Sequence, residues 1–181
     1  MINPYAAGSS GRPAVCLSER MNPIAQILAP ERILVDLPVA SRDALFSALG
    51  ELFARTCGLD AGKLADALGA RERLGSTGLG MGIAIPHQRI KGLKEPLGAF
   101  VRLAAPIDFA ALDAQPVRLF FVMLAPEQAT EAHLRLLAEL AQMFSDKAFR
   151  ETLCTAAEAA QIMTAFADWS PNAPSERSAA V

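Results

Sequence analysis

The sequence predicts an α/β fold with a mixed β-sheet flanked by helices on both faces. Segments with the periodicity of strands and of helices alternate along most of the 181 residues. The segments 97–103 and 117–124 are apolar on both alternating faces apart from Arg102 and Arg118, as is typical of strands covered on both sides. The segment 127–144 has the clearest helical periodicity. These patterns predict the layers of the fold and leave the strand order open.

The expected helices and strands follow one another closely. Ser41 and Gly58 are suited to open and close the first long helix. Thr155 and Glu158 fit a capping box that opens the last helix. The full expected order is a helical turn at 24–28, a strand at 33–37, helices at 41–58 and 60–73, a glycine-rich loop at 75–82, strands at 83–85, 97–103 and 117–124, and helices at 127–144 and 155–169.

Two expectations concern the interior of this fold. Leu134, Leu137, Ala141 and Phe144 recur at helical spacing, so they predict the buried face of their helix. The two strand arginines are interpreted as solvated residues at a strand or sheet edge, because unpaired charges are rarely buried.

Composition limits the class of protein. The apolar class makes up 52% of the residues and only 20% are charged, which indicates a globular chain. The formal net charge of -2 disfavours a nucleic-acid or acidic-lipid surface. No apolar stretch approaches the ~20 residues that span a bilayer, and the start of the chain lacks the apolar centre of a secretory signal. We therefore expect no membrane insertion, no nucleic-acid partner and a cytoplasmic location.

The ends and the cysteines are also informative. We expect one domain at 23–169, a flexible leader at 1–22 and a disordered tail at 170–181, because both ends are rich in turn-forming residues and lack periodicity. The three cysteines have long spacings, unlike a metal knuckle or a redox pair. No metal and no cofactor are expected.

The segment with the most chemical content runs from Arg71 to His87 and reads RERLGSTGLGMGIAIPH. It contains four glycines within eight residues, and glycine permits positive φ and close approach of the backbone. Successive N–H groups in such a loop can form an anion-binding nest. Ser76 and Thr77 add hydroxyl donors, and Arg71 adds a guanidinium suited to phosphate oxygens.

The glycine spacing differs from that of nucleotide-binding loops. Gly75 and Gly80 have the spacing of a phosphate-binding loop, but Met81 and Gly82 stand where Lys and Ser or Thr are required. The dinucleotide fingerprint fails because its third glycine position is Ile83. ATP, GTP and NAD are therefore disfavoured as ligands.

A phosphoryl-accepting histidine accounts for the same residues better. Phosphoryl transfer needs a nucleophile, in-line positioning and donors that spread the charge. Neutral imidazole is a usable nucleophile near pH 7 because its unperturbed pKa is ~6.5. Pro86 would restrict the position of His87. Simpler interpretations stay open, in which Ser76 and Thr77 cap a turn and Arg71 is a helix-end charge.

The segment resembles the active-site signature of the mannitol/fructose-type IIA domains of the bacterial phosphotransferase system. That signature reads Arg-Glu, two variable residues, Gly-Ser-Thr-Gly, Ile or Leu, Gly, a variable residue, Gly, Ile or Val, and Ala-Ile-Pro-His, and every fixed position is matched. The resemblance extends over about residues 24–169, whose predicted layers agree with the family fold. Within the group, the chain most resembles the nitrogen-related regulatory branch, IIA-Ntr, with support from residues 115–124 and 126–133.

The resemblance implies a role for each residue of the site. His87 is expected to be phosphorylated on Nε2, and Arg71 and His133 to be the accessory pair that assists the phosphate. A packed structural histidine is the alternative for His133, which precedes Leu134. One departure from the family pattern is Gln88, which stands where a small residue is usual and could alter partner docking. The expected phosphate-binding residues are Gly75, Ser76, Thr77 and Gly78.

The resemblance also implies a function. The leading hypothesis is a phosphotransferase component that accepts a phosphoryl group on His87 from an HPr-like phosphocarrier (NPr). Its phosphorylation state would regulate partners such as potassium-transport regulators. One alternative is a sugar-specific IIA component that passes phosphate to a IIB domain for fructose/mannitol-type uptake, although the chain shows no IIB-like or membrane segment. Another is a binding module that has lost phosphorylation, for which Gln88 is the only hint.

Overall fold

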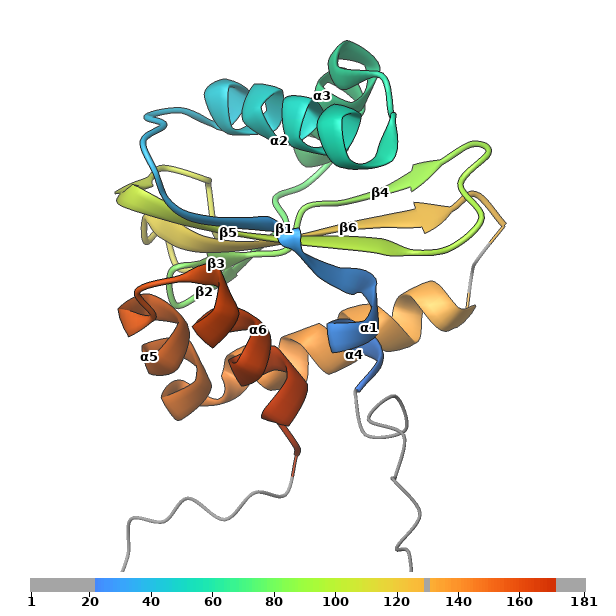
Figure 1. Cartoon of the computed structure of the whole chain (residues 1–181). Helices are drawn as coiled ribbons and strands as arrows, with labels where there is room; N and C mark the ends of the chain where they lie inside the picture. The colour runs from blue at the N-terminus through green and yellow to red at the C-terminus, as the bar shows by residue number, and fades with distance from the viewer. Residues whose placement is uncertain (1–21, 129–130, 172–181) are drawn as a thin grey trace, which may run out of the picture.

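A computed structural model of the protein describes residues 22–128 and 131–171 (Figure 1). Apart from residues 22, 170 and 171, the predicted leader and tail lie outside the described residues. The helices are α1 (Pro23–Ile27), α2 (Arg42–Cys57), α3 (Ala61–Arg73), α4 (Glu131–Ser145), α5 (Lys147–Thr155) and α6 (Ala159–Asp168). The strands are β1 (Leu28–Leu37), β2 (Gly78–Gly80), β3 (Ile83–Ala84), β4 (His87–Ile90), β5 (Leu97–Ile107) and β6 (Val117–Pro126).

The strands form one mixed sheet in the order β1-β5-β6-β3-β2, and β4 also pairs with β6. The pairs β1–β5, β3–β6 and β4–β6 are parallel, whereas β5–β6 and β2–β3 are antiparallel. Helices α2 and α3 cover one face of the sheet, and α1, α4, α5 and α6 cover the other (Figure 1). The predicted mixed sheet with helices on both faces is confirmed.

The central strands are apolar on both faces because each face belongs to a separate core. In β6, Leu119 and Phe121 pack in the core shared with α4, α5 and α6, while Phe120 and Val122 pack in the core shared with α2 and α3. This follows from the alternation of side chains along a strand. In the first core, the ring of Phe166 from α6 lies 5.2–6.3 Å, centroid to centroid, from rings of β5, β6, α4 and α5.

The helix ends on the α2 and α3 side follow the sequence prediction. The Ser41 hydroxyl accepts the N–H of Ala44 at 3.2 Å, and Gly58 closes α2 with a left-handed φ of 69°. Asp60 caps α3 by accepting the N–H of Lys63 at 3.0 Å. These caps fix the helix pair that leads into the glycine-rich segment.

The C-terminal helices differ from the prediction. Helix α5 was not predicted, although Asp146 supplies its N-cap and accepts the N–H groups of Ala148 and Phe149. The predicted capping box is wrong, because Thr155 is the last residue of α5 and its hydroxyl donates to the Glu151 carbonyl at 2.9 Å. Helix α6 begins after Glu158 without a side-chain cap.

The predicted apolar stripe of α4 is wrong except at Phe144. Leu134 is 62% exposed, Leu137 is only partly buried, and Ala141 is exposed. The helix carries two neighbouring apolar stripes, and periodicity alone does not tell which of them faces the sheet. The buried face consists of His133, Leu136, Leu140, Met143 and Phe144.

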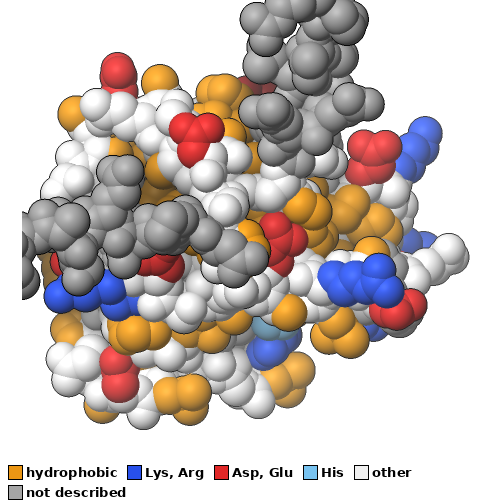
Figure 2. Space-filling model, turned by 90° about the horizontal axis from the view of Figure 1, so that it is seen from below, with side chains coloured by type: hydrophobic (Ala, Val, Ile, Leu, Met, Phe, Trp, Pro, Cys, Tyr) orange, Lys and Arg blue, Asp and Glu red, His pale blue; other side chains and the backbone are white. Residues whose placement is uncertain are grey.

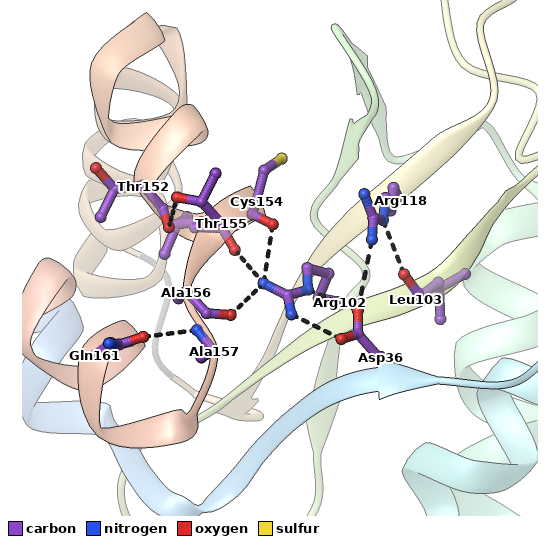
Figure 3. A network of polar contacts seen from close by, with 11 residues as sticks. Asp36, Arg102, Leu103, Arg118, Thr152, Cys154, Thr155, Ala156, Ala157 and Gln161 are labelled. Carbon is purple, nitrogen blue, oxygen red and sulfur yellow. Dashed lines mark hydrogen bonds and ion pairs between the residues drawn. The ribbon is translucent and has the colours of Figure 1, made fainter.

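The interpretation of Arg102 as a solvated residue is also wrong, because this residue is only 4% exposed. Its Nε and Nη2 donate to the two carboxylate oxygens of Asp36, each at 2.9 Å (Figure 3). Arg102 thereby lowers the pKa of the Asp36 carboxyl. Arg118 remains half-exposed and lies 3.5 Å from Asp36. The Nη1 of Arg102 donates to three carbonyls at the end of α5, those of Leu153, Cys154 and Ala156.

Candidate active site

The end of α3 and the start of β4 bring Arg71 and His87 together. Arg71 lies in the last turn of α3, where the helix dipole favours a positive charge. His87 is the first residue of β4 and lies in register with Met123 of β6. Pro86 separates β3 from β4, and its carbonyl accepts the N–H of Met123 at 2.9 Å. The strands on either side of Pro86, β3 and β4, both pair with β6. This pairing fixes the backbone of His87.

The contacts of the His87 ring define which nitrogen carries the proton. Nδ1 lies 2.9 Å from the carbonyl oxygen of Ile85, and Nε2 lies 3.3 Å from Nη2 of Arg71. A carbonyl oxygen only accepts and a guanidinium only donates. We therefore assign a neutral ring with the proton on Nδ1 and a lone pair on Nε2, directed at Arg71.

The surroundings keep this ring neutral. Burial lowers the pKa of His87 below its ordinary value of 6.5, and the positive charge of Arg71 acts in the same direction. The hydrogen bond to the Ile85 carbonyl and the negative charge of Glu72 raise the pKa of His87, but the net direction is downward. A neutral imidazole at pH 7 is the form that acts as a nucleophile.

His133 lies beside His87 although it comes from α4. The ring centroids are 5.6 Å apart, with an angle of 56° between the ring planes. His133 is 5% exposed, and its Nδ1 has no hydrogen-bond partner among the described residues. Burial lowers the pKa of His133, and the charges of His87 and Arg89 lower it further. The second ring is therefore also neutral, and its unpartnered Nδ1 is buried beside the ring of His87.

The four predicted phosphate-binding residues run from the end of α3 to the first residue of β2, but their hydrogen bonds in the structure hold the protein together. The Ser76 hydroxyl donates to the Phe109 carbonyl at 2.9 Å and accepts the N–H of Gly78 at 3.1 Å. Thr77 directs both its N–H and its hydroxyl to Glu72. The N–H of Gly75 donates to the Glu72 carbonyl at 3.2 Å. Phosphate binding by these residues stays a prediction.

Two glycines of this segment are required by geometry. A Cβ on Gly78 would lie 2.7 Å from the Cβ of Ala111, closer than real side chains allow. Gly80 has a φ of 90°, which only glycine adopts without strain. These positions let the loop before β6 pack against the glycine-rich segment.

A cavity of about 260 Å³ opens beside His87 and is bounded by both apolar and polar groups. Figure 2, viewed from the side of α4, α5 and α6, shows only a small histidine surface next to basic and hydrophobic side chains. Two of the leucines that line this cavity are exposed, with exposed fractions of 88% for Leu112 and 38% for Leu79. The cavity is lined by Arg71, Ser76, Thr77, Gly78, Leu79, Ile85, His87, Leu112, Leu137 and Ala141.

Sequence reasoning missed two parts of the site. Glu72 had no predicted role beyond its place in the motif. In the structure it is 6% exposed, and its carboxylate accepts hydrogen bonds from the N–H and the hydroxyl of Thr77. The apolar rim was missed because Leu137 and Ala141 were assigned to the core. The sequence feature that could have indicated this rim is the second apolar stripe on α4.

The part of the chain that the structure describes contains neither a metal-binding cluster nor a membrane-spanning helix. Within it, no group of three or more His, Cys, Asp or Glu side chains is placed to hold a metal ion. No helix among the same residues has both the length and the apolar character needed to cross a membrane.

This fold and this neutral histidine define a class of protein, the IIA components of phosphotransferase systems. Residues 26–169 match the family described as "Phosphoenolpyruvate-dependent sugar phosphotransferase system, EIIA 2", and the chain belongs to this family. The family is a component of a phosphotransferase system, which confirms the resemblance inferred from the sequence.

The relatives narrow the class further. The chain is 47% identical over 132 residues to the nitrogen regulatory protein of Pseudomonas aeruginosa, covering 72% of this chain and 86% of the relative. The crystal structure of the nitrogen regulatory protein IIA-Ntr from Neisseria meningitidis aligns with a TM-score of 0.75 at 43% identity, covering 79% of this chain and 98% of the other. The crystal structure of IIA mannitol from Escherichia coli aligns with a TM-score of 0.65 at 20% identity, covering 77% and 98%, which shows the shared fold.

Proposed function

We propose that the protein is a regulatory phosphocarrier in which Nε2 of His87 accepts a phosphoryl group from an HPr-like phosphocarrier (NPr). The observation that carries this proposal is the arrangement of the His87 ring. Its Nδ1 is held by a backbone carbonyl, and its Nε2 lone pair faces a guanidinium. A nucleophile fixed in this way needs little other protein chemistry for phosphoryl transfer.

The proposed step is an in-line displacement at phosphorus. The Nε2 lone pair of His87 forms the new N–P bond while the N–P bond to the donor histidine breaks, and the electron pair of that bond returns to the donor imidazole. The Arg71 guanidinium lies beside the reacting nitrogen and would pair with the phosphoryl oxygens. Phosphorylation therefore replaces the Arg71–Nε2 contact with contacts from Arg71 to phosphate.

The remaining site residues are proposed to support the phosphoryl group. His133 lies close enough to His87 to assist from the other side, and its Nδ1 is unpaired among the described residues. Ser76, Thr77 and Gly78 line the same cavity, and Gly75 directly precedes them in the chain. For its hydroxyls to bind phosphate, Ser76 and Thr77 must exchange their present partners.

The rim of the cavity supports transfer from a protein donor. Two exposed leucines border the opening, and their exposed fractions are 88% for Leu112 and 38% for Leu79. A carrier protein that covers this rim would bury apolar surface and exclude water from the reacting atoms. This arrangement suits a protein donor better than a free nucleotide.

We propose regulation as the outcome of this phosphorylation, in the cytoplasm and on target proteins such as potassium-transport regulators. The similarity to nitrogen regulatory proteins supports this choice. A phosphoryl group adds negative charge and acceptor oxygens at the centre of an apolar rim. The phosphorylated and free forms would therefore bind different partners.

A sugar-specific IIA function is the second candidate. The chain is 34% identical over 139 residues to a protein of Haloferax volcanii named as a fructose-specific EIIA component of the phosphotransferase system, covering 74% of this chain and 87% of that relative. The same His87 chemistry would then pass the phosphoryl group to a IIB domain. Transfer from the phosphorylated protein to a IIB domain, compared with binding to a regulatory target, distinguishes the two functions.

The hypothesis of a binding module without phosphorylation rests on Gln88. Adjacent residues of a strand point to opposite faces, so the Gln88 side chain is directed away from the face of His87. Its amide donates to the Arg89 carbonyl at 3.2 Å. Gln88 thus leaves the nucleophile accessible, which supports the phosphocarrier over the module.

Incubation with a phosphorylated HPr-type donor tests the proposed function. We expect one acid-labile phosphoryl group per chain and no label on His87→Ala. A reference IIA protein shows that the donor is active. Absence of label on the wild-type chain, with the reference labelled, would overturn the phosphocarrier function and support the binding module.

A further inference from the structure

A continuous path of hydrogen bonds joins a buried carboxylate to the reacting histidine. The two carboxylate oxygens of Glu72 accept the N–H of Thr77 at 2.9 Å and its hydroxyl at 2.6 Å. The carbonyl of Thr77 then accepts the N–H of Ile85 at 3.0 Å. The carbonyl of Ile85 accepts the Nδ1–H of His87 at 2.9 Å.

We infer that Glu72 is a positioning residue, which acts through Thr77 and Ile85 to fix the carbonyl that holds Nδ1 of His87. This inference rests on the proposed function, because it concerns the nitrogen that receives the phosphoryl group. If the Ile85 carbonyl is held in place, the proton stays on Nδ1 and Nε2 keeps its lone pair. If the carbonyl moves, the ring can rotate or exchange tautomers.

The burial of the path explains why it holds one geometry. Glu72 is 6% exposed and Thr77 is 7% exposed, so water competes little for either group. Hydrogen bonds to a charged acceptor are about twice as strong as those between neutral groups. Both donors of Thr77 are used on one carboxylate, which fixes the residue in position and orientation. Arg71 precedes Glu72 in α3 and contacts Nε2 of His87. Neighbouring residues at the end of α3 therefore act on both ring nitrogens of His87, Arg71 directly and Glu72 through the path.

The negative charge of Glu72 affects a second measurable quantity, the pKa of His87, which can be measured without phosphoryl transfer. Glu72 raises the pKa of His87, while burial and Arg71 lower it. Among the described residues, the titratable ring of His133 from α4 also packs against His87, with 5.6 Å between the ring centroids. Removing the negative charge of Glu72 should therefore lower the pKa of His87 further.

The test compares Glu72→Gln with Glu51→Gln, which removes the same charge from an exposed position on α2. Nitrogen-15 NMR of the His87 ring reports the tautomer and the pKa without any donor protein. We expect Glu72→Gln to lower the His87 pKa and to mix the two tautomers, whereas Glu51→Gln matches wild type. Phosphoryl uptake should fall by about tenfold to a hundredfold in Glu72→Gln, because small misplacements of reacting groups cost rates of that order.

A pair of variants at Thr77 tests the same path even if Glu72→Gln does not fold. Thr77→Ser keeps both donors to Glu72 and should retain the wild-type tautomer of His87. Thr77→Val removes the hydroxyl donor and should reproduce the tautomer mixing. The inference is overturned if Glu72→Gln or Thr77→Val shows the same His87 tautomer, pKa and rate as its control. Failure of wild-type labelling would refute the proposed function instead, and the NMR comparison would still decide the role of Glu72.

Discussion

Two arginines, Arg102 of β5 and Arg71 of α3, have opposite environments in the fold. Arg102 is 4% exposed, and its guanidinium is satisfied by Asp36 and by carbonyls at the end of α5. Arg71 is partly exposed, with one carbonyl contact to Gly75 at 3.0 Å and a longer contact to His87. A fully satisfied guanidinium holds structure together, whereas one with remaining donors can receive a phosphoryl group.

The largest expected effect is the loss of stability in Arg102→Ala. This change leaves buried carbonyls of α5 without a donor and removes the ion pair with Asp36. We expect a loss of about 3 kcal/mol of unfolding free energy, since each unsatisfied buried group costs about 1–3 kcal/mol. Urea unfolding measures this change.

The matched control is Arg118→Ala, which removes the half-exposed arginine beside the same carboxylate. Its expected cost is within about 1 kcal/mol, as for other surface ion pairs. Equal losses in the two variants would contradict the structural role assigned to Arg102.

Arg71→Ala should show the opposite pattern. We expect stability within about 1 kcal/mol of wild type, because its one backbone contact is near the surface. Phosphoryl uptake should fall by about a hundredfold, the usual cost of removing one donor to developing charge. The control is Arg73→Ala, which changes an exposed residue two positions further along α3. This variant should keep the wild-type rate. A normal rate in Arg71→Ala would remove this arginine from the site.

The site also predicts how stability depends on pH. The folded-state pKa values of His87 and His133 lie below the ordinary 6.5, so the unfolded chain binds more protons as the pH falls through that value. Their contribution to stability is therefore complete above 6.5 and is lost as the pH falls toward the folded-state values. Urea unfolding at about pH 7.5 and about pH 5.5 should show this loss.

The double variant His87→Asn, His133→Asn provides the control for this pH dependence. It should lose less stability than wild type between the same two pH values, because the histidine contribution is absent. An identical loss in both proteins would assign the pH dependence to other groups.

The smallest expected effect lies in the glycine-rich segment. Met81 has a left-handed φ of 56° and is 55% exposed. Asparagine tolerates this backbone conformation better than methionine does. Met81→Asn should raise the unfolding free energy by about 0.5–1 kcal/mol, a fraction of the usual cost of the left-handed conformation. Unchanged or lower stability would show that the Met81 side chain has a packing role.

The two arginines also show what sequence can predict. Arg71 and His87 are 16 residues apart within one motif, and their proximity follows from the helix, turn and strand between them. The acceptors of Arg102 on α5 are 51 to 54 residues away, so no local pattern indicates them. The sheet and its two covering layers were predictable because alternation along β5 and β6 is a local property. The face of α4 was not, because its two apolar stripes differ only in what the fold places against them.

Glu72 marks the same limit within the candidate site. Its position in the motif is evident, but its bonds to Thr77 depend on the exact turn that follows α3. The pairing of His87 with His133 likewise depends on how α4 crosses the sheet. Residue types in a motif therefore predict the chemistry, while the contacts that orient them come from the tertiary structure.

The most direct test of the account is the position of the phosphoryl group on the phosphorylated chain. Nitrogen-15 and phosphorus-31 NMR of the protein after donor treatment reports which ring nitrogen is bonded to phosphorus. We predict a single phosphoryl group on Nε2 of His87. A phosphoryl group on Nδ1 of His87, or on His133, would contradict it.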